Sequence, residues 1–510
     1  MAPDLKNRRP ARACGDDRMA TLASNCCALL ALCIALCWPG GRGLADPIDG
    51  TDIIKAHGQY SAAYLSDWST LPTGKDWARR DRADRSFESL SGDAAKRWYS
   101  DQDRVHISGE TLQVNWPNAD YDNQVFHIRD VGTVIIEDVA VVHRDADYRG
   151  YHSVLIENCD TAVIRNSSFF GAVEHSHIKI KGCRDVLIDN VEIAGIDYDK
   201  SGRYRSGGGI FIENGNQHRK RSFGGPGWRE LEWLVIQNAY IHDLTGSDGT
   251  RRNHDAIIVH TPADGVIFNN VIENWLDRHG DAAIDVGFRR PGPPGRFLRI
   301  ERNIVRNANR TKTPGEFGDG SSAVLWANNL MMNVFHGDYH EGWSNHFVHN
   351  TYVWDPDKLP LLLEDAFALD AFYKLWTDMD YPSFGRNNLL YMNVPGQFWI
   401  TYQSGGKPDK YRNLHTDHSV YLTTAPTRTG WLVSDADNEG PTLRTFEDWK
   451  RVTGNDRHSI VGVASPDGFM DYAAGDYRLS ERSPAAGAGS AASVTTRDPR
   501  MAVTRDFLGQ

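Results

Sequence analysis

The chain contains a degenerate repeat in which apolar and polar residues alternate along two short strands that flank a polar corner. Three copies align without gaps, at Val125–Asp138, Ser153–Asn166 and His177–Asn190. Each copy ends on Asp or Asn, at the same distance from an apolar residue of its first strand. Repeats of roughly 20–30 residues that contain strands and lack helices are typical of a β-solenoid, in which each coil stacks on its neighbours. The pattern therefore predicts an all-β fold.

Less regular coils follow these three copies. Strand-like segments recur at 209–213, 256–260 and 283–287, and the repeat extends from about Val105 to Trp399. Asp or Asn occupies one turn in six copies, which predicts a single internal ladder of stacked polar side chains. The members of this predicted ladder are Asp138, Asn166, Asn190, Asn238, Asn270 and Asn350.

The flanking segments lack the repeat. Residues 46–103 are charged and rich in tryptophan, with helical patterns at 62–65 and 87–98, and we interpret them as a cap over the open end of the solenoid. A further helix is predicted at 366–376, and loss of the period at about 408–459 indicates a cap or loop region. The predicted organisation is a leader at 1–45, a partly helical N-terminal cap at 46–103, a solenoid with loop insertions at 104–490 and a tail at 491–510.

Residues 1–45 have the pattern of a secretory signal peptide. A basic stretch precedes an apolar run at 20–38, and Gly43-Leu44-Ala45 follows as a small-residue cleavage signal. Translation could begin at Met1 or at Met19. Because the apolar run is short for a bilayer span, we expect a secreted or periplasmic protein without a membrane span.

Charge and cysteine content narrow the possible partners and the compartment. The full chain has a formal net charge of −11 at pH 7, and removal of the leader makes the mature chain more acidic. This balance argues against nucleic acid as a partner, although a local basic groove could still bind an anionic sugar polymer. Outside the leader, Cys159 and Cys183 occupy the same repeat position, so we expect them on adjacent coils about 4.8 Å apart. A disulfide and a stacked pair of free thiols both fit that placement.

Strand alternation places two outward columns side by side on the predicted sheet. The first column contains Lys179, Phe211, Ile258 and Asp285, and the second contains Arg129, Glu157, Lys181, Glu213 and His260, with Gly287 closing it. Opposite charges on neighbouring coils would stabilise one another as an ordinary surface ladder. The same columns also suit a sugar-binding floor, so Lys179, Lys181 and Glu213 are predicted to bind substrate. A register slip of one residue would exchange inward and outward positions.

The densest group of ionisable residues adjoins these columns, in two segments that each precede a strand. Crowded carboxylates and imidazoles shift one another's pKa values and suit general acid–base catalysis, whereas capping Asp and loop His residues are the simpler explanation. The predicted catalytic residues are His254, Asp255, His260, His279, Asp281 and Asp285. Arg278 and Arg289 could hold a carboxylate and Trp275 could stack on a sugar ring, which completes the predicted substrate-binding set.

A segment near the end of the chain is similar to one found in a known protein family. The segment Asp476–Gly489 reads Asp-Tyr-Arg-Leu-Ser-Glu-Arg-Ser-Pro-Ala-Ala-Gly-Ala-Gly. With this segment, the chain from Val105 to Gly489 resembles the secreted right-handed parallel β-helix proteins of the pectate-lyase-like superfamily. The resemblance implies that fold and chemistry on a polysaccharide. Between Val105 and Gly489 the paired Asp-Asp and the Gly-His-Gly of the pectin hydrolases are missing, as is the Arg-x-Pro-x-x-Arg of one pectate lyase group, so the reaction stays open.

Two reactions fit the ionisable cluster. A lyase would neutralise the carboxylate of a uronic acid, remove C5–H with a His or Lys base and release the glycosidic oxygen. Either an arginine or a Ca²⁺ ion held by Asp281 and Asp285 could neutralise that carboxylate, and no other metal site is assigned. A hydrolase would instead use two carboxylates from Asp255, Asp281 and Asp285. The histidines favour a lyase, and we expect a monomer acting on an acidic polysaccharide.

Further alternatives stay open. A uronate epimerase would share the first step of the lyase, and a β-helix without catalysis could simply bind carbohydrate. Residues 336–343 contain metal-ligand residue types without a characteristic spacing, and we interpret them as a loop at the far end of the groove. Trp326, Trp343 and Trp354 are further stacking candidates, although burial is the commoner role of tryptophan.

Overall fold

A computed structural model of the 510-residue chain divides into two compact units, Met1–Asp49 and Gly50–Gln510. All described residues belong to the second unit, so the predicted leader at 1–45 and the predicted helical pattern at 62–65 lie outside them. The described residues are 86–117, 122–143, 151–171, 173–194, 208–213, 229–245, 255–261, 263–276, 282–286, 296–312, 323–340, 344–358, 371–375, 383–393, 398–402, 413–426, 430–434, 442–490 and 503.

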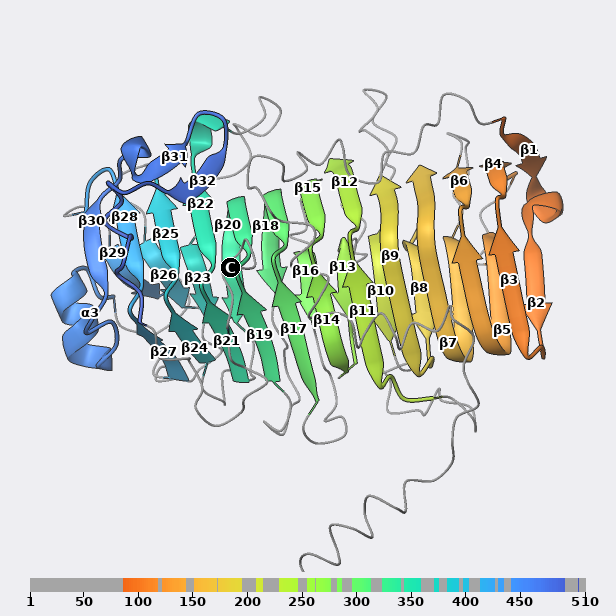
Figure 1. The fold of residues 1–510 in the computed structure, drawn as a ribbon, viewed down its shortest axis with the longest axis horizontal. Coiled ribbons are helices and arrows are strands. Elements are labelled where there is room, and N and C mark those ends of the chain that lie inside the picture. Colours follow the sequence, from red (N-terminus) through yellow and green to blue (C-terminus); the bar gives the residue numbers. More distant parts are fainter. Residues whose placement is uncertain are drawn as a thin grey trace, which may run out of the picture. The chain divides into compact units, whose positions relative to one another are not determined.

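The second unit forms a parallel β-helix, which confirms the predicted fold class (Figure 1). Each coil adds one strand to each of three parallel ladders. We call these ladders the first, second and third faces, in the order in which each complete coil passes through them from β2 (Arg97–Ser100) onward. Five long strands turn a corner and serve more than one face: β5 (Gln124–Glu137), β7 (His152–Gly171), β9 (Asp185–Ala194), β18 (Ile304–Lys312) and β20 (Leu330–His340).

The remaining strands each belong to one face. The first face contains β2 (Arg97–Ser100), β8 (Ser176–Lys181), β10 (Gly208–Glu213), β13 (Ile257–Val259), β16 (Ala282–Val286), β23 (Ala371–Leu375), β26 (Phe398–Tyr402) and β29 (Gly430–Ser434). The second contains β3 (Arg104–Ser108), β11 (Trp233–Gln237), β14 (Asp264–Phe268), β17 (Phe297–Glu301), β19 (Ala323–Ala327), β21 (Ser344–Val348), β24 (Ser383–Arg386) and β27 (Leu414–Asp417). The third contains β1 (Glu88–Ser91), β4 (Thr111–Asn115), β6 (Ala140–His143), β12 (Tyr240–Thr245), β15 (Val271–Leu276), β22 (Thr351–Trp354), β25 (Leu389–Met392), β28 (Val420–Thr423) and β30 (Ile460–Val463).

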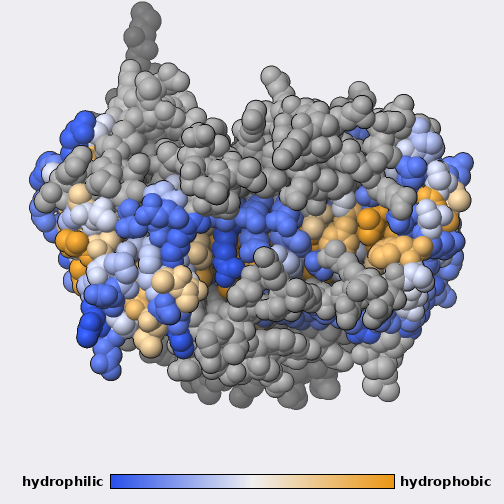
Figure 2. Space-filling model, turned by 90° about the horizontal axis from the view of Figure 1, so that it is seen from above, coloured by the Kyte–Doolittle hydropathy of each residue, from blue (hydrophilic) through white to orange (hydrophobic). Residues whose placement is uncertain are grey.

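Inward side chains form one apolar core along the stack. Ile156, Ile180 and Ile212 are consecutive register partners, and all three are buried. Branched side chains fit this arrangement because each packs on its counterpart one coil away. Apolar side chains are not confined to the interior, and in the view from above a hydrophilic middle lies beside a hydrophobic area toward the N-terminal coils (Figure 2).

The corner between the second and third faces is the tightest connection in each coil. Two residues make the turn, and the first of them has a left-handed backbone, with φ 74° at Gly109 between β3 and β4 and φ between 51° and 59° in the later described coils. Asn tolerates this conformation better than most residues, which explains its recurrence. This outer corner column contains Asp138, Asn166, Asn190, Asn238, Asn269, Arg302, Asn328, His349, Asn387 and His418.

The second corner residue points inward and builds a separate ladder of asparagines. The Oδ1 of Asn303 accepts the backbone N–H of Asn270 at 3.0 Å and its side-chain N–H at 2.9 Å. The Nδ2 of Asn303 donates to the carbonyl of Ile267 and to Asn329 Oδ1, both at 3.0 Å. This inner corner ladder contains Asn270, Asn303, Asn329, Asn350 and Asn388.

The prediction of a single internal ladder was therefore wrong in part. Asn270 and Asn350 do lie in the inner corner ladder, but Asp138, Asn166, Asn190 and Asn238 belong to the outer corner column, one residue earlier in the coil. The two columns are adjacent in sequence and both favour Asn, so spacing alone merges them.

Three secondary-structure predictions were also wrong. Residues 87–98 form β1, a 3₁₀ helix at Gly92–Ala95 and the start of β2, and β1 and β2 already pair with the next coil. The described end of the helix predicted at 366–376 is strand β23, while its start lies outside the described residues. Within 408–459 the strands β27, β28 and β29 still pair with β24, β25 and β26, although the helix at Phe446–Thr453 fits the predicted cap. Strands β1, β2, β27 and β28 span four residues each, which is too short a run for the alternation to be recognised.

The C-terminal part ends the stack and lies against its side. Helix α3 (Phe446–Thr453) begins at Thr445, whose hydroxyl accepts the N–H of Asp448 at 3.0 Å, and buried Trp449 is packed in the core. A 3₁₀ turn at Pro356–Lys358 and another at Pro466–Gly468 precede the antiparallel pair β31 (Phe469–Asp471) and β32 (Asp476–Leu479). Phe469 and Tyr477 pack on outward apolar side chains of the third face. No helix in the described part of the chain is long and apolar enough to cross a membrane.

The inner corner ladder should contribute strongly to stability. Asn303→Ala leaves a backbone N–H and a backbone carbonyl of neighbouring coils without their partner, which we expect to cost roughly 2–4 kcal/mol. Asn190→Gly is the matched control, because glycine accepts the left-handed backbone and only one amide bond is lost, at about 1 kcal/mol or less. Urea unfolding followed by circular dichroism measures both. Equal losses in the two variants would contradict the distinction between the ladders.

Candidate functional site

Long connections enter and leave the first face. The chain uses residues 195–207 to pass from β9 to β10, 214–232 from β10 to β11, 246–256 from β12 to β13 and 287–296 from β16 to β17. The corner between the second and third faces, in contrast, always takes two residues. Loops on a rigid scaffold are where proteins place binding and catalytic groups, so the first face is the candidate site.

The strand register confirms both predicted outward columns on this face. One column runs through Lys179, Phe211, Ile258 and Asp285, and the other runs through Arg129, Glu157, Lys181 and Glu213. The backbone N–H of His260 donates to the carbonyl of Ile212 at 2.9 Å, which places His260 next after Glu213 in the second column.

Lys179 has the most unusual environment in the first column. Its side chain is only 4% exposed, its Nζ lies 2.9 Å from Glu213 Oε1, and it lies 3.0 Å from the centroid of the Phe211 ring. Burial disfavours the charged amine and outweighs the attraction of Glu213, which lowers the pKa of Lys179 to about 7. A substantial fraction of this amine is therefore a neutral base at physiological pH.

A second charged row lies toward the N-terminal coils. Glu157 accepts a hydrogen bond from His127 at 3.0 Å and lies 3.5 Å from the Nζ of Lys181. Burial alone would raise the pKa of Glu157, but the His127 hydrogen bond and the Lys181 charge hold it below its usual value. Trp98, which is 62% exposed, contacts the His127 ring edge-on at 3.9 Å. The exposed indole and these charges form the open part of the described face.

Two histidines that sequence reasoning missed, His152 and His175, join the predicted His260 near Phe211. His175 stacks on Phe211 with ring centroids 5.3 Å apart, and His260 meets the same ring edge-on at 5.1 Å. His152 lies 5.2 Å from His175, and burial, with the nearby Lys179 charge, holds the pKa of His152 well below its usual value. Both His152 and His175 come just before or at the start of first-face strands, which is the position that drew attention to His254 and Asp255.

The structure describes three of the six predicted catalytic residues. Asp255, His260 and Asp285 are all buried, and His260 Nε2 lies 3.7 Å from Asp285 Oδ2. Asp255 Oδ1 accepts the backbone N–H of Ala282, so one of its oxygens holds the next coil in place. The structure therefore brings His260 and Asp285 together, and it gives Asp255 a structural role.

Several predicted residues lie outside the described part of the chain, namely His254, His279, Asp281, Arg278, Arg289 and Gly287. Ca²⁺ binding by Asp281 and Asp285 thus stays a prediction. Trp275 is fully buried in the apolar core, so the prediction that it stacks on substrate was wrong, and Trp326 and Trp354 are core residues as well. Trp343 and Glu341 also lie outside the described residues, as do the side chains of 336–340.

A buried hydrogen-bond chain lies beside the start of the first face. The indole N–H of Trp116 donates to His143 Nδ1 at 3.2 Å. Since an indole N–H can only donate, His143 Nε2 donates to Ser153 Oγ and the hydroxyl donates to His177 Nδ1, each at 2.8 Å. His177 Nε2 then donates to the carbonyl of Gly171 at 3.0 Å. Both histidines are therefore neutral, and burial lowers the pKa of His177 to about 3.

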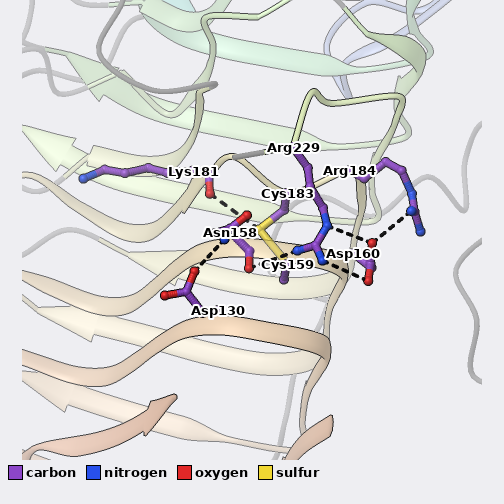
Figure 3. Close-up of a disulfide and its surroundings, with 8 residues drawn as sticks. All are labelled: Asp130, Asn158, Cys159, Asp160, Lys181, Cys183, Arg184 and Arg229. Carbon is purple, nitrogen blue, oxygen red and sulfur yellow. Dashed lines mark hydrogen bonds and ion pairs between the residues drawn. A yellow bond between two sulfur atoms is a disulfide. The ribbon is translucent and has the colours of Figure 1, made fainter. Parts of the chain in front are cut away.

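A disulfide joins adjacent coils next to the second column. Cys159 and Cys183 are bonded with their Cα atoms 4.5 Å apart, which decides between the two predicted states in favour of the disulfide. Next to the disulfide, Arg229 Nε and Arg184 Nη1 each lie 2.9 Å from Asp160 Oδ1 (Figure 3). Arg229 belongs to the 214–232 connection, so this cluster anchors the return of that connection to the second face.

The described first face thus combines an amine whose pKa is about 7, imidazoles and exposed cations along one stack of strands. Such a set can take up a proton from a substrate and bind its negative charge. Comparison with protein-family models and with curated proteins finds none that matches the chain.

The histidine chain predicts loss of stability in acid. The unfolded chain takes up a proton on His177 below pH 6.5, whereas the folded chain resists until about pH 3. Stability from this group is complete above pH 6.5 and falls as the pH drops, by up to about 1.4 kcal/mol per pH unit. Urea midpoints at a series of pH values should therefore show a shallower acid slope in His177→Gln than in the unmodified protein. The exposed His349, replaced by Asn, should leave the slope unchanged, and an unchanged slope in His177→Gln would contradict the assignment.

Proposed function

We propose that this protein is an exported enzyme that cleaves a uronic-acid-containing polysaccharide by β-elimination along the first face. The observation that carries the proposal is Lys179, a buried amine with a pKa of about 7 in the middle of an outward column. An amine with this pKa is a base at neutral pH, which is what removal of a proton next to a carboxylate requires.

The chemistry assigns separate roles to the charged residues. Cations neutralise the uronate carboxylate, which makes C5–H more acidic. Lys179 takes the C5 proton, the electron pair forms the C4=C5 double bond, and the C4–O bond breaks. The leaving oxygen takes a proton from an acid such as a protonated histidine or water. The Glu213 carboxylate accepts a hydrogen bond from Lys179. It thereby stabilises the Lys179 ammonium that forms when the proton is taken from C5.

Exposed groups on the N-terminal coils support an acidic polymer as the substrate. Arg129 is half exposed and Lys181 is about a quarter exposed, and both belong to the second outward column. Trp98 offers an open aromatic surface at the head of the first column. Sugars present C–H-rich faces that pack on such rings, while guanidinium and ammonium groups pair with carboxylates.

The described carboxylates favour elimination over hydrolysis. Hydrolysis needs two carboxyl groups that flank the scissile bond. Asp255 already binds a backbone N–H of the next coil, and Asp285 faces His260 at 3.7 Å, so neither is paired with a second carboxylate among the described contacts. A lysine base needs no such pair.

Other observations support export and the wider family resemblance. The sequence pattern of residues 1–45 and the Cys159–Cys183 disulfide both suit an oxidising compartment outside the cytosol. The parallel β-helix agrees with the resemblance to the pectate-lyase-like superfamily, whose similar C-terminal segment packs here on the third face. We therefore include membership of that superfamily in the proposal.

The reaction type can be read from one experiment. The protein is incubated with a panel of uronic-acid and neutral polysaccharides while unsaturated products, by ultraviolet absorbance, and reducing ends are followed together. Both signals should rise on an acidic polymer. Reducing ends without absorbance would show hydrolysis and overturn the proposal, and binding without either signal would favour an epimerase or a binding module.

Lys179 variants test the proposed base. Lys179→Met and Lys179→Arg should lower kcat by about 100-fold or more, since a positioned base contributes about 10²–10⁴-fold. In the unmodified protein kcat/KM should rise with pH through about 7 as the amine loses its proton, and this limb should vanish in both variants. Lys181→Ala is the matched control, because it removes a neighbouring cation and should mainly raise KM. Near-normal kcat in a folded Lys179 variant would exclude this residue as the base.

A further inference from the structure

Two histidines and one carboxylate meet at the C-terminal end of the stack, far along the chain from the candidate site. Asp417 ends β27, and His418 follows it in the outer corner column with φ 54°. His458 belongs to the next coil, where it precedes β30. The cluster therefore joins two successive coils.

The Asp417 carboxylate is held in a fixed orientation. Its Oδ1 accepts the backbone N–H groups of His418 at 3.0 Å and His458 at 2.8 Å. Its Oδ2 faces the imidazoles, 2.9 Å from His458 Nδ1 and 3.7 Å from His418 Nε2. Burial alone would raise the pKa of Asp417, but the side-chain hydrogen bond from His458 and the backbone N–H bonds hold it below its usual value. One carboxylate oxygen is thus positioned by the backbone while the other is directed at two imidazole nitrogens.

The three potential ligand atoms all lie within 4.8 Å of one another. The two imidazole rings are stacked, with centroids 4.7 Å apart and planes at 7°. A metal ion must lie near the plane of each ring that binds it, so one ring has to turn. His458, with a side chain that is 63% exposed, has the room to do so.

Other described His–carboxylate contacts lack this convergence. His127 and His260 each face one carboxylate, Glu157 and Asp285 respectively. His242 lies between two carboxylates, but its two ring nitrogens face different ones. Among the described residues, the Asp417 cluster is the group of three whose ligand atoms converge.

We propose that Asp417, His418 and His458 bind a divalent transition-metal ion such as Zn²⁺ or Co²⁺. Two imidazole nitrogens and one carboxylate oxygen match the preferences of these ions, whereas Ca²⁺ and Mg²⁺ prefer oxygen ligands throughout. Three protein ligands leave a position for water. His418 also lines a cavity of about 550 Å³ beside the C-terminal segment, so solvent has space next to the ion.

Such an ion would tie the last coils of the β-helix together. Asp417 and His418 belong to one coil and His458 to the next, so an ion bound by all three opposes their separation. A ligand that binds only the folded chain stabilises it by mass action, so the midpoint of thermal unfolding should rise with metal concentration. This role is independent of the proposed lyase activity.

Metal binding is tested on the full chain without a histidine tag. Titration with ZnCl₂ by calorimetry should show one saturable site, and CoCl₂ should give the visible d–d absorption of Co²⁺ with nitrogen ligands. Thermal unfolding should shift upward with added Zn²⁺. CaCl₂ and MgCl₂ at the same concentrations should produce neither heat of binding at this site nor a shift.

Substitutions separate metal binding from folding. His458→Ala, Asp417→Asn and His418→Asn should each weaken Zn²⁺ binding at least about tenfold, and asparagine suits the left-handed backbone at 418. His349→Asn is the matched control, because His349 shares the outer corner column and the cavity but lies apart from Asp417. Lack of saturable Zn²⁺ binding in the unmodified chain, or equal binding in His458→Ala, would overturn the proposal and leave only an ion pair.

Discussion

The tight corner between the second and third faces is the constraint on which the rest of the structure depends. Each coil must turn there in two residues, with one in a left-handed backbone and the next facing the core. From Asn270 to Asn388 the inward residue is an asparagine that binds both the coil before it and the coil after it. A slip of one residue would bury the wrong side chains and break these bonds, so the corner holds every coil in register.

Register at the corner decides which side chains meet on the first face. Strands β8 and β10 are neighbours in the stack (Figure 1). Because they pair without a register shift, Lys179 lies beside Phe211 and Glu213 although more than thirty residues of chain separate Lys179 from them. The same stacking aligns Cys159 with Cys183 and brings His127 and Lys181 to Glu157. Insertions collect at the edges of the first face, where they do not disturb the corner. The scaffold and the candidate site are thus separated within each coil.

Burial then changes what the aligned residues can do chemically. Lys179 is an ordinary cation in the sequence, and the desolvated environment turns it into a base near neutral pH. Asp255 is an attractive catalytic carboxylate in the sequence, but in the structure one of its oxygens is used to bind a backbone N–H of the next coil. Trp275 follows the same rule, since its indole fills the core. Residue type and spacing identify the candidates, and the contacts that each side chain makes in the folded chain select among them.

The repeat by itself predicted a stacked β-solenoid, the two outward columns and the juxtaposition of the cysteines, because a period-two pattern assigns each side chain to a face. It could not separate the outer corner column from the inner ladder, since both positions favour asparagine and differ by one residue. It also misjudged residues 87–98 and 408–459, where β1, β2, β27 and β28 span only four residues each, too few to reveal a period. Only the tertiary structure decided the pKa of Lys179, the direction of the Trp116–His143–Ser153–His177 chain and the meeting of His458 with Asp417. Those properties depend on desolvation and on contacts between different coils, and no local pattern encodes either.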